Sequence, residues 1–144
     1  MASLSVVHLF RNSLSGEIMP SLYITPALQV LWLNNQPHDR LSRRINVVAI
    51  MVSLTSLWLQ RNSFAGSVPM NIGDLVSLRD LDLNGPGTSS FGLIPRGLSE
   101  MSLDQLDLNN NCFMDLIPDF EASKVSFWSN DFVCPRLGLC VLLK

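Results

Sequence analysis

The sequence predicts a short curved solenoid of about five stacked repeats, with a parallel β-sheet on its inner, concave face. Two observations predict this fold class. A pattern of three apolar residues recurs five times at nearly constant spacing along the 144 residues. In addition, 47% of the residues are hydrophobic and only 15% are charged, a composition that is typical of a packed core and excludes a disordered chain.

Each repeat contains a window of the form Leu-x-x-Leu-x-Leu, with valine once in place of the second leucine. The windows start at Leu4, Leu28, Leu54, Leu78 and Leu103, so successive starts lie 24, 26, 24 and 25 residues apart. The Leu-x-Leu alternation has the period of a β-strand and places both leucines on one face. We expect one buried row formed by Leu9, Leu33, Leu59, Leu83 and Leu108. A second row beside it is expected from Val7, Leu31, Leu57, Leu81 and Leu106.

A carboxamide follows four of the five predicted strands, where the chain must turn away from the sheet: Asn12, Gln36, Asn62 and Asn111. A buried amide carries both donors and acceptors, so it can satisfy the backbone groups of such a turn. These residues are predicted to form a structural ladder. Pro86 occupies the corresponding position of the fourth repeat and is predicted to interrupt that ladder.

The residues after the strands share a second pattern, since "SLSGEI" begins at Ser13 and "SFAGSV", followed by Pro69, begins at Ser63. Together with the windows, this pattern resembles the plant-type leucine-rich repeat (LRR), LxxLxLxxNxLxGxIP. The resemblance covers about residues 3–118. It implies an α/β-type LRR solenoid, mostly parallel β, with a second short strand near the Gly-x-Ile-Pro segment and irregular or 3₁₀ turns on the convex side.

The chain is predicted to consist of leucine-rich repeats over residues 1–118 and a C-terminal capping segment over residues 119–144. The capping segment is expected to fold over the last repeat through Val125, Phe127 and Trp128, closed by a Cys134–Cys140 disulfide. A structural role for this cysteine pair is favoured over a metal or redox site, because no histidine lies nearby and the spacing differs from Cys-x-x-Cys. Cys112 is predicted to be a small buried residue.

Three longer stretches, "ALQVLWLNNQ", "VAIMVSLTSLWLQRNSFAGSVP" and "IPDFEASKVSFWSNDFVCPRLGLC", resemble the first leucine-rich block of the TMK-type (transmembrane kinase) plant receptor kinases. This resemblance implies a receptor-like kinase ectodomain on the extracellular face of the plasma membrane, with a protein or peptide ligand on the concave face and a co-receptor. It also implies growth signalling linked to auxin, although no residues here indicate an auxin site. The N-terminus does not look like a secretory signal and no membrane segment is predicted, so we expect a fragment or truncated product.

The sequence contains no pattern typical of catalysis, a cofactor or a metal site. His8 and His38 do not form an HExxH motif, and there is no GxSxG motif and no glycine-rich loop followed by lysine and serine or threonine. Kinase signatures such as HRD and DFG are absent. The net charge of −2 gives no support for nucleic-acid binding. A non-enzymatic chain without a cofactor is therefore predicted.

The residues between the core leucines should point outward onto the concave surface. They predict a divided binding surface, with an aromatic half formed by Phe10, Trp32 and Trp58, flanked by Arg11 and Arg61. The other half is a predicted acidic cluster of Asp80, Asp82 and Asp107. Exposed tryptophan beside arginine has the composition of an interface hot spot. In the alternative interpretation, the tryptophans only cover the sheet and the aspartates are solvated, or the aspartates bind calcium.

Two other functions stay open at the level of sequence. The first is a soluble inhibitor of the polygalacturonase-inhibitor kind, which would block a cell-wall enzyme with its concave face. The second is a degenerate product without a stable fold, for which cooperative unfolding of the purified chain would be the contrary result.

Overall fold

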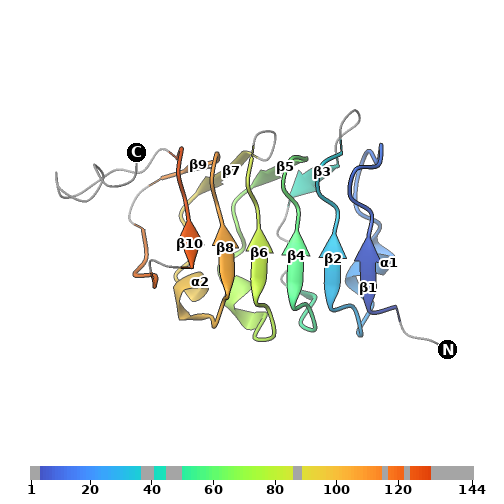
Figure 1. Cartoon of the computed structure of the whole chain (residues 1–144), viewed down its shortest axis with the longest axis horizontal. Helices are drawn as coiled ribbons and strands as arrows, with labels where there is room; N and C mark the ends of the chain where they lie inside the picture. Colours follow the sequence, from blue (N-terminus) through green and yellow to red (C-terminus); the bar gives the residue numbers. More distant parts are fainter. Residues whose placement is uncertain are drawn as a thin grey trace.

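The computed structural model describes residues 4–36, 41–44, 50–85, 89–114, 117–121 and 124–130. Its main feature is a six-stranded parallel sheet in the order β1-β2-β4-β6-β8-β10, in which the strands stand in a single row (Figure 1). The strands are β1 (Val6–His8), β2 (Val30–Trp32), β4 (Ser56–Trp58), β6 (Asp80–Asp82), β8 (Gln105–Asp107) and β10 (Val125–Ser126). We call it the long sheet.

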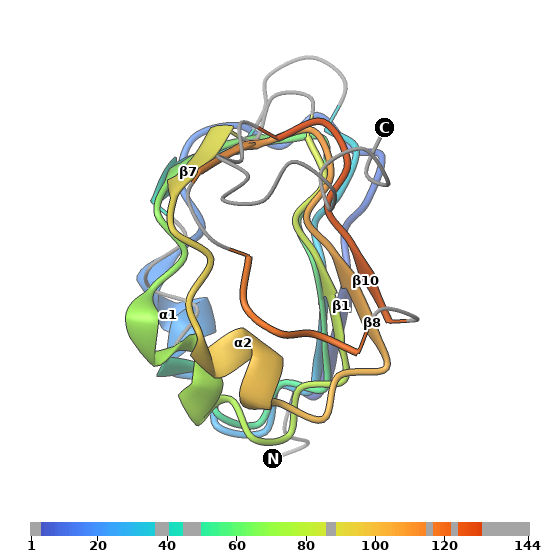
Figure 2. The same ribbon diagram turned by 90° about the vertical axis from the view of Figure 1, so that its left-hand side faces the viewer.

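The register of the long sheet follows the repeat. Leu31 pairs with Leu57, Leu57 with Leu81, and Leu81 with Leu106, so equivalent positions of successive repeats lie beside one another. Seen end-on in Figure 2, β1, β8 and β10 lie along one side of the core, and β7, α1 and α2 lie on the other. The predicted solenoid with a parallel sheet is confirmed.

The opposite side of each repeat carries a second, short-stranded sheet and irregular turns. The second sheet has the order β3-β5-β7-β9, with β3 (Ser42–Arg44), β5 (Ser63–Gly66), β7 (Ser89–Gly92) and β9 (Cys112–Phe113). The convex turns contain the helices α1 (Pro20–Tyr23) and α2 (Gly97–Glu100) and the 3₁₀ helix η2 (Met70–Asp74). Both features agree with the expected plant-type repeat.

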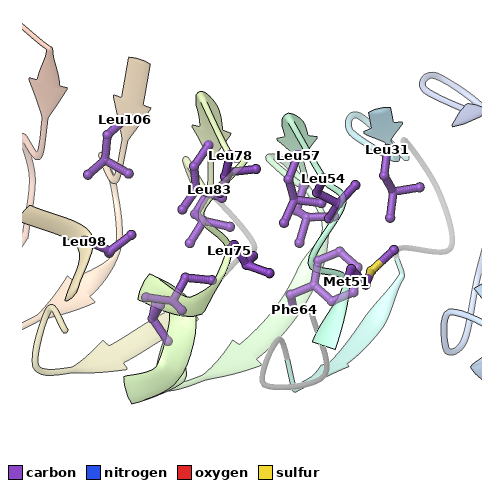
Figure 3. Close-up of a cluster of buried hydrophobic side chains, with 14 of the residues drawn as sticks. Leu31, Met51, Leu54, Leu57, Phe64, Leu75, Leu78, Leu83, Leu98 and Leu106 are labelled. Atoms are coloured by element: carbon purple, nitrogen blue, oxygen red, sulfur yellow. The ribbon is translucent and has the colours of Figure 1, made fainter. Parts of the chain in front are cut away.

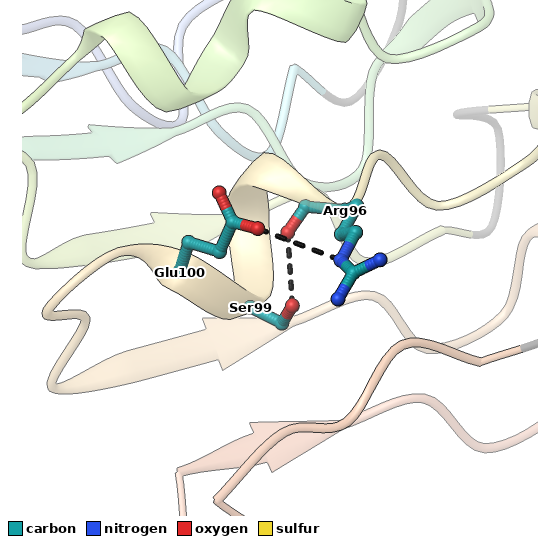
Figure 4. A network of polar contacts seen from close by, with 3 residues as sticks. All are labelled: Arg96, Ser99 and Glu100. Carbon is teal, nitrogen blue, oxygen red and sulfur yellow. Dashed lines mark hydrogen bonds and ion pairs between the residues drawn. The ribbon is translucent and has the colours of Figure 1, made fainter.

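Glycine allows the two neighbouring convex helices η2 and α2 to touch. A Cβ atom on Gly73 would lie 3.2 Å from the Cα atom of Gly97. In the same region, the α2 residue Glu100 forms an exposed ion pair with Arg96 at 3.5 Å, and the Ser99 hydroxyl donates to the Arg96 carbonyl (Figure 4). An ion pair this exposed adds little stability, so the packing of α2 depends on the close backbone contact and on Leu98, which is 1% exposed.

The interior rows of leucines form the core (Figure 3). Leu57 and Leu59 of β4 and its following turn are completely buried, and the equivalent residues of the second, fourth and fifth repeats are at most 2% exposed. The first repeat differs from the prediction of uniform rows, because Leu9 is 41% exposed. The reason is geometric: β1 is the edge strand of the long sheet, and no described residue lies on its outer side.

The carboxamides after the inner strands each connect two repeats. Asn62 Nδ2 donates to the carbonyl of Leu59 in its own repeat at 3.0 Å and to that of Leu33 in the preceding repeat at 2.9 Å. Its Oδ1 atom accepts from the Leu41 amide at 3.3 Å. Gln36 and Asn111 likewise bind carbonyls in their own and the preceding repeat. Asn12 differs, because it is exposed and its hydrogen-bond partners among the described residues are the carbonyls of Leu9 and Phe10 within its own repeat.

The segment expected to cap the solenoid contains a further strand of the long sheet. Val125 pairs with Leu106, and β10 therefore extends the sheet beyond the fifth repeat. Asn130 acts as the next ladder carboxamide, since its Nδ2 atom donates to the carbonyls of Leu108 and Phe127 at 2.9 and 3.0 Å. The start of residues 119–144 is thus a shortened sixth repeat in its geometry.

Predictions for one proline and for the three cysteines have different outcomes. Pro86, Cys134 and Cys140 lie outside the described residues. Cys112 is a free cysteine and is exposed, so the prediction that it is buried was wrong. The reason is its place in β9, where Phe113 takes the inward position and Cys112 faces outward.

Candidate recognition surface

The outward face of the long sheet carries a continuous stack of three rings. His8 lies on Trp32 with ring centroids 4.1 Å apart and planes 13° from parallel, and Trp32 lies on Trp58 at 4.2 Å and 10°. The stack follows from register, because neighbouring parallel strands hold equivalent side chains about 4.8 Å apart. The Trp32 indole Nε1 donates to the Ser56 hydroxyl at 2.9 Å. This bond fixes the ring and helps to bury Ser56.

The side chains of Trp32 and Trp58 border a small hollow, which we call the aromatic hollow. It has a volume of about 190 Å³ and is lined by Phe10, Arg11, Trp32, Asn34, Asn35 and Trp58. The structure therefore brings together four of the five residues predicted for the aromatic half. Arg61 is exposed at the following turn with a φ of 55° and does not line this hollow. Asn34 is only 6% exposed, and its Oδ1 atom is buried without a hydrogen-bond partner among the described residues.

Trp58 also borders a second, larger hollow, which we call the acidic hollow. Its volume is about 390 Å³. Between β4 and β8, the polar and aromatic residues that line it are Trp58, Gln60, Asp80, Asp82, Gln105 and Asp107. Lys124 and Ser126 close its far side. All three predicted aspartates meet here, beside one of the two predicted tryptophans.

Neighbouring carboxylates lie within the acidic hollow. Asp82 pairs in register with Asp107, and its Oδ1 atom accepts from the Asn84 amide at 3.0 Å. Burial, reinforced by the charge of Asp107 and opposed by the Asn84 bond, raises the pKa of Asp82 to about 6. Burial, followed by the charge of Asp104, also raises the pKa of Asp80. The hollow therefore holds acids that are short of solvent and of positive partners.

The raised pKa of Asp82 predicts a dependence of stability on pH. Because the pKa in the folded state lies above its ordinary value of 3.8, the contribution of Asp82 to stability is full below about pH 3.8 and is lost as the pH rises through 6. We expect Asp82→Asn to raise the free energy of unfolding at pH 7.5 by about 1 kcal/mol, a value reduced for the partial exposure of the group. The measurement is urea denaturation between pH 4 and 7.5. The exposed Asp119→Asn variant is the control, and an equal gain in both variants would contradict this assignment.

Several contributors to the surface were absent from the predicted site. His8 lies between two core residues and was therefore expected to point outward, but no binding role was predicted for it. Its position beside Trp32 in the repeat alignment was enough to predict that the two rings stack. Gln60 and Asp104 were also outside the predicted set. Among the described residues, no group of three or more His, Cys, Asp or Glu side chains could hold a metal ion. Nor does any described helix have the length and apolar character needed to cross a membrane.

Known proteins share the repeat and the fold of this chain. The leucine-rich repeat profile matches residues 53–75 and 102–122. The chain is 35% identical over 133 residues to the Arabidopsis thaliana receptor-like kinase TMK4, and 37% identical over 101 residues to TMK2 of the same plant. This chain has the leucine-rich repeat fold. These matches cover 88% and 69% of the chain, but only 13% and 11% of the two relatives.

Solved leucine-rich repeat ectodomains share the same architecture. The Arabidopsis receptor kinase HAESA, solved with the peptide hormone IDA and the co-receptor SERK1, superposes with a TM-score of 0.76 at 27% identity. The superposition covers 90% of this chain and 22% of HAESA. The leucine-rich repeat chain thus resembles part of a plant receptor ectodomain, a region that is typically non-catalytic.

Proposed function

We propose that this leucine-rich repeat chain is a non-catalytic recognition module that binds a peptide or protein ligand on the outward, concave face of the long sheet. In this proposal it forms part of a TMK-like receptor kinase ectodomain outside the plant cell, acts with a co-receptor, and serves growth signalling linked to auxin. The observation that carries the proposal is an aromatic track in which Trp32 stacks on Trp58, with Phe10 beside them in the aromatic hollow, and in which Trp58 lines both hollows.

The physical character of this track supports recognition. Large aromatic side chains held rigidly by stacking contribute contact area while losing little conformational entropy, and such residues dominate binding energy at interfaces. Both tryptophans keep part of their surface accessible, even though their stacked faces are covered. Proteins with a fold of this kind have different functions, so the aromatic surface and the relatives support a recognition function more strongly than the solenoid alone does.

The test is selection of a random peptide library against the immobilised chain, followed by affinity measurements on single peptides. We expect Trp58→Ala to weaken the binding of selected peptides by about 30-fold, the loss typical when a tryptophan at the centre of an interface is truncated. Met70→Ala, which removes an exposed apolar side chain from η2 on the convex side, is the control and should leave affinity unchanged.

Thermal melts of both variants separate binding from folding. Loss of the stacked ring should cost about 1 kcal/mol of stability, which leaves the chain folded at the temperature of the assay. Peptides that bind wild-type and Trp58→Ala chains equally well would place recognition elsewhere on the molecule. Failure to select any peptide would count against the function itself.

A further inference from the structure

We propose that the acidic hollow receives a cationic side chain, an arginine or lysine of the ligand, between the open face of Trp58 and the carboxylates of Asp82 and Asp107. This inference rests on the proposed function, because it names the chemistry that the same surface recognises. Three features support it: the orientation of Trp58, two acceptor oxygens that have no donor among the described residues, and the pairing of the lysine that lines the hollow with a glutamate.

Trp58 is the end of the ring stack. One of its faces is covered by Trp32 at 4.2 Å, whereas the next residue in register on the other side is Asp82. The second face therefore borders the acidic hollow. Tryptophan is the aromatic side chain that attracts cations most strongly through its ring face, and guanidinium groups also stack on it.

Two acceptor oxygens of residues that line the hollow have no hydrogen-bond donor among the described residues. Among the described residues, the Oε1 atom of Gln60 is buried without a hydrogen-bond partner. Asp82 uses Oδ1 for the Asn84 amide, and its Oδ2 atom accepts no hydrogen bond from the described residues. A buried acceptor without a donor is costly, and a guanidinium supplies five N–H donors in a planar fork. The unsatisfied oxygen of Gln60 points to a donor-rich ligand independently of the acids.

Charge balance within the hollow favours the same occupant. Lys124 is the cation that lines it, but its Nζ atom is held by Glu121 at 3.0 Å. Asp82 and Asp107 face each other across β6 and β8, and Asp107 Oδ2 accepts from the neutral amide of Asn84 at 3.0 Å. A ligand cation would relieve the repulsion between the two carboxylates and replace the solvent that Asp82 has lost.

The test uses defined probes rather than an unknown ligand. An acetylated, amidated glycine-serine heptapeptide with a central arginine is compared with its lysine and citrulline counterparts, since citrulline keeps the shape of arginine without its charge. Binding is followed by tryptophan fluorescence and by the indole signals in ¹H–¹⁵N spectra. We expect the arginine peptide to bind about tenfold more tightly than the citrulline peptide and to shift the Trp58 signal.

Paired variants locate the effect. Asp82→Asn/Asp107→Asn should reduce the arginine preference to less than about twofold while the chain stays folded. Asp74→Asn/Glu100→Gln removes the same charge from the convex side and should keep the preference, so a general loss of electrostatic attraction is distinguishable from a site. Equal binding of the arginine and citrulline peptides, or a preference that survives in the Asp82/Asp107 variant, would overturn the proposal.

The peptide selection described above separates this inference from the function on which it rests. Selected peptides that depend on Trp58 but show no enrichment in arginine or lysine would leave recognition standing and sink the cationic site. Binding of a neutral oligosaccharide such as cellopentaose to the Trp58 face, without any arginine preference, would also sink it. A library that yields no binders would remove both.

Discussion

Leu59→Ala is expected to lower the free energy of unfolding by about 3–4 kcal/mol, one of the largest effects of any single truncation in this chain. Leu59 follows the central strand β4 and is completely buried, with the equivalent leucines Leu33 and Leu83 on either side in the stack. Removing its side chain opens a cavity between two repeats that are held by their own strand pairing and cannot collapse into it. Urea denaturation at neutral pH measures the loss.

Leu9→Ala is the matched control, because it makes the same change at the same position of the first repeat. Leu9 is 41% exposed, so little apolar area returns to water and no closed cavity forms. We expect a cost below about 1 kcal/mol. Similar losses in the two variants would mean that burial at the edge of the stack equals burial in its middle, contrary to the structure.

The contrast between Leu59 and Leu9 also shows how far the sequence could predict the fold. The spacing of the leucines was sufficient for the solenoid, the strand positions and the register, because each of these depends on a local pattern repeated at a fixed interval. Burial at the end of the stack depends on what covers β1, and the repeat pattern cannot predict whether β1 is covered. The sixth strand was missed for a related reason: its window contains Val125 and Phe127 where the others have leucine, although Asn130 marked the ladder position.

The candidate site was predicted in its parts but not in its arrangement. Strand alternation and register placed Trp32 beside Trp58 and Asp82 beside Asp107, and the structure has both neighbours. The division into two hollows that share Trp58 was beyond the sequence, because it depends on side-chain conformations. The sequence also could not predict the burial of Asn34. Nor could it predict the electrostatic repulsion between Asp80 and Asp104, which lies one residue before β8.

Asn62→Ala is the second large effect, with an expected loss of about 3 kcal/mol of stability. Asn62 is fully buried, and its amide donates to the carbonyls of Leu33 and Leu59 while its oxygen accepts from the Leu41 amide. Alanine would leave these backbone groups without partners in an interior that water does not reach, which costs about 1–3 kcal/mol for each group that stays unsatisfied. Hydrogen exchange should also show faster exchange of the Leu41 amide.

Asn12→Ala separates the ladder from a general preference for asparagine at this turn. Asn12 makes two bonds to carbonyls of its own repeat, but it is exposed, so water replaces the amide when it is removed. We expect a loss below about 1 kcal/mol by urea denaturation. If Asn12→Ala were as costly as Asn62→Ala, the stabilisation would come from the turn within one repeat. A difference of 2 kcal/mol or more would place it in the bridge between repeats, the contact that makes neighbouring units of the solenoid unfold together.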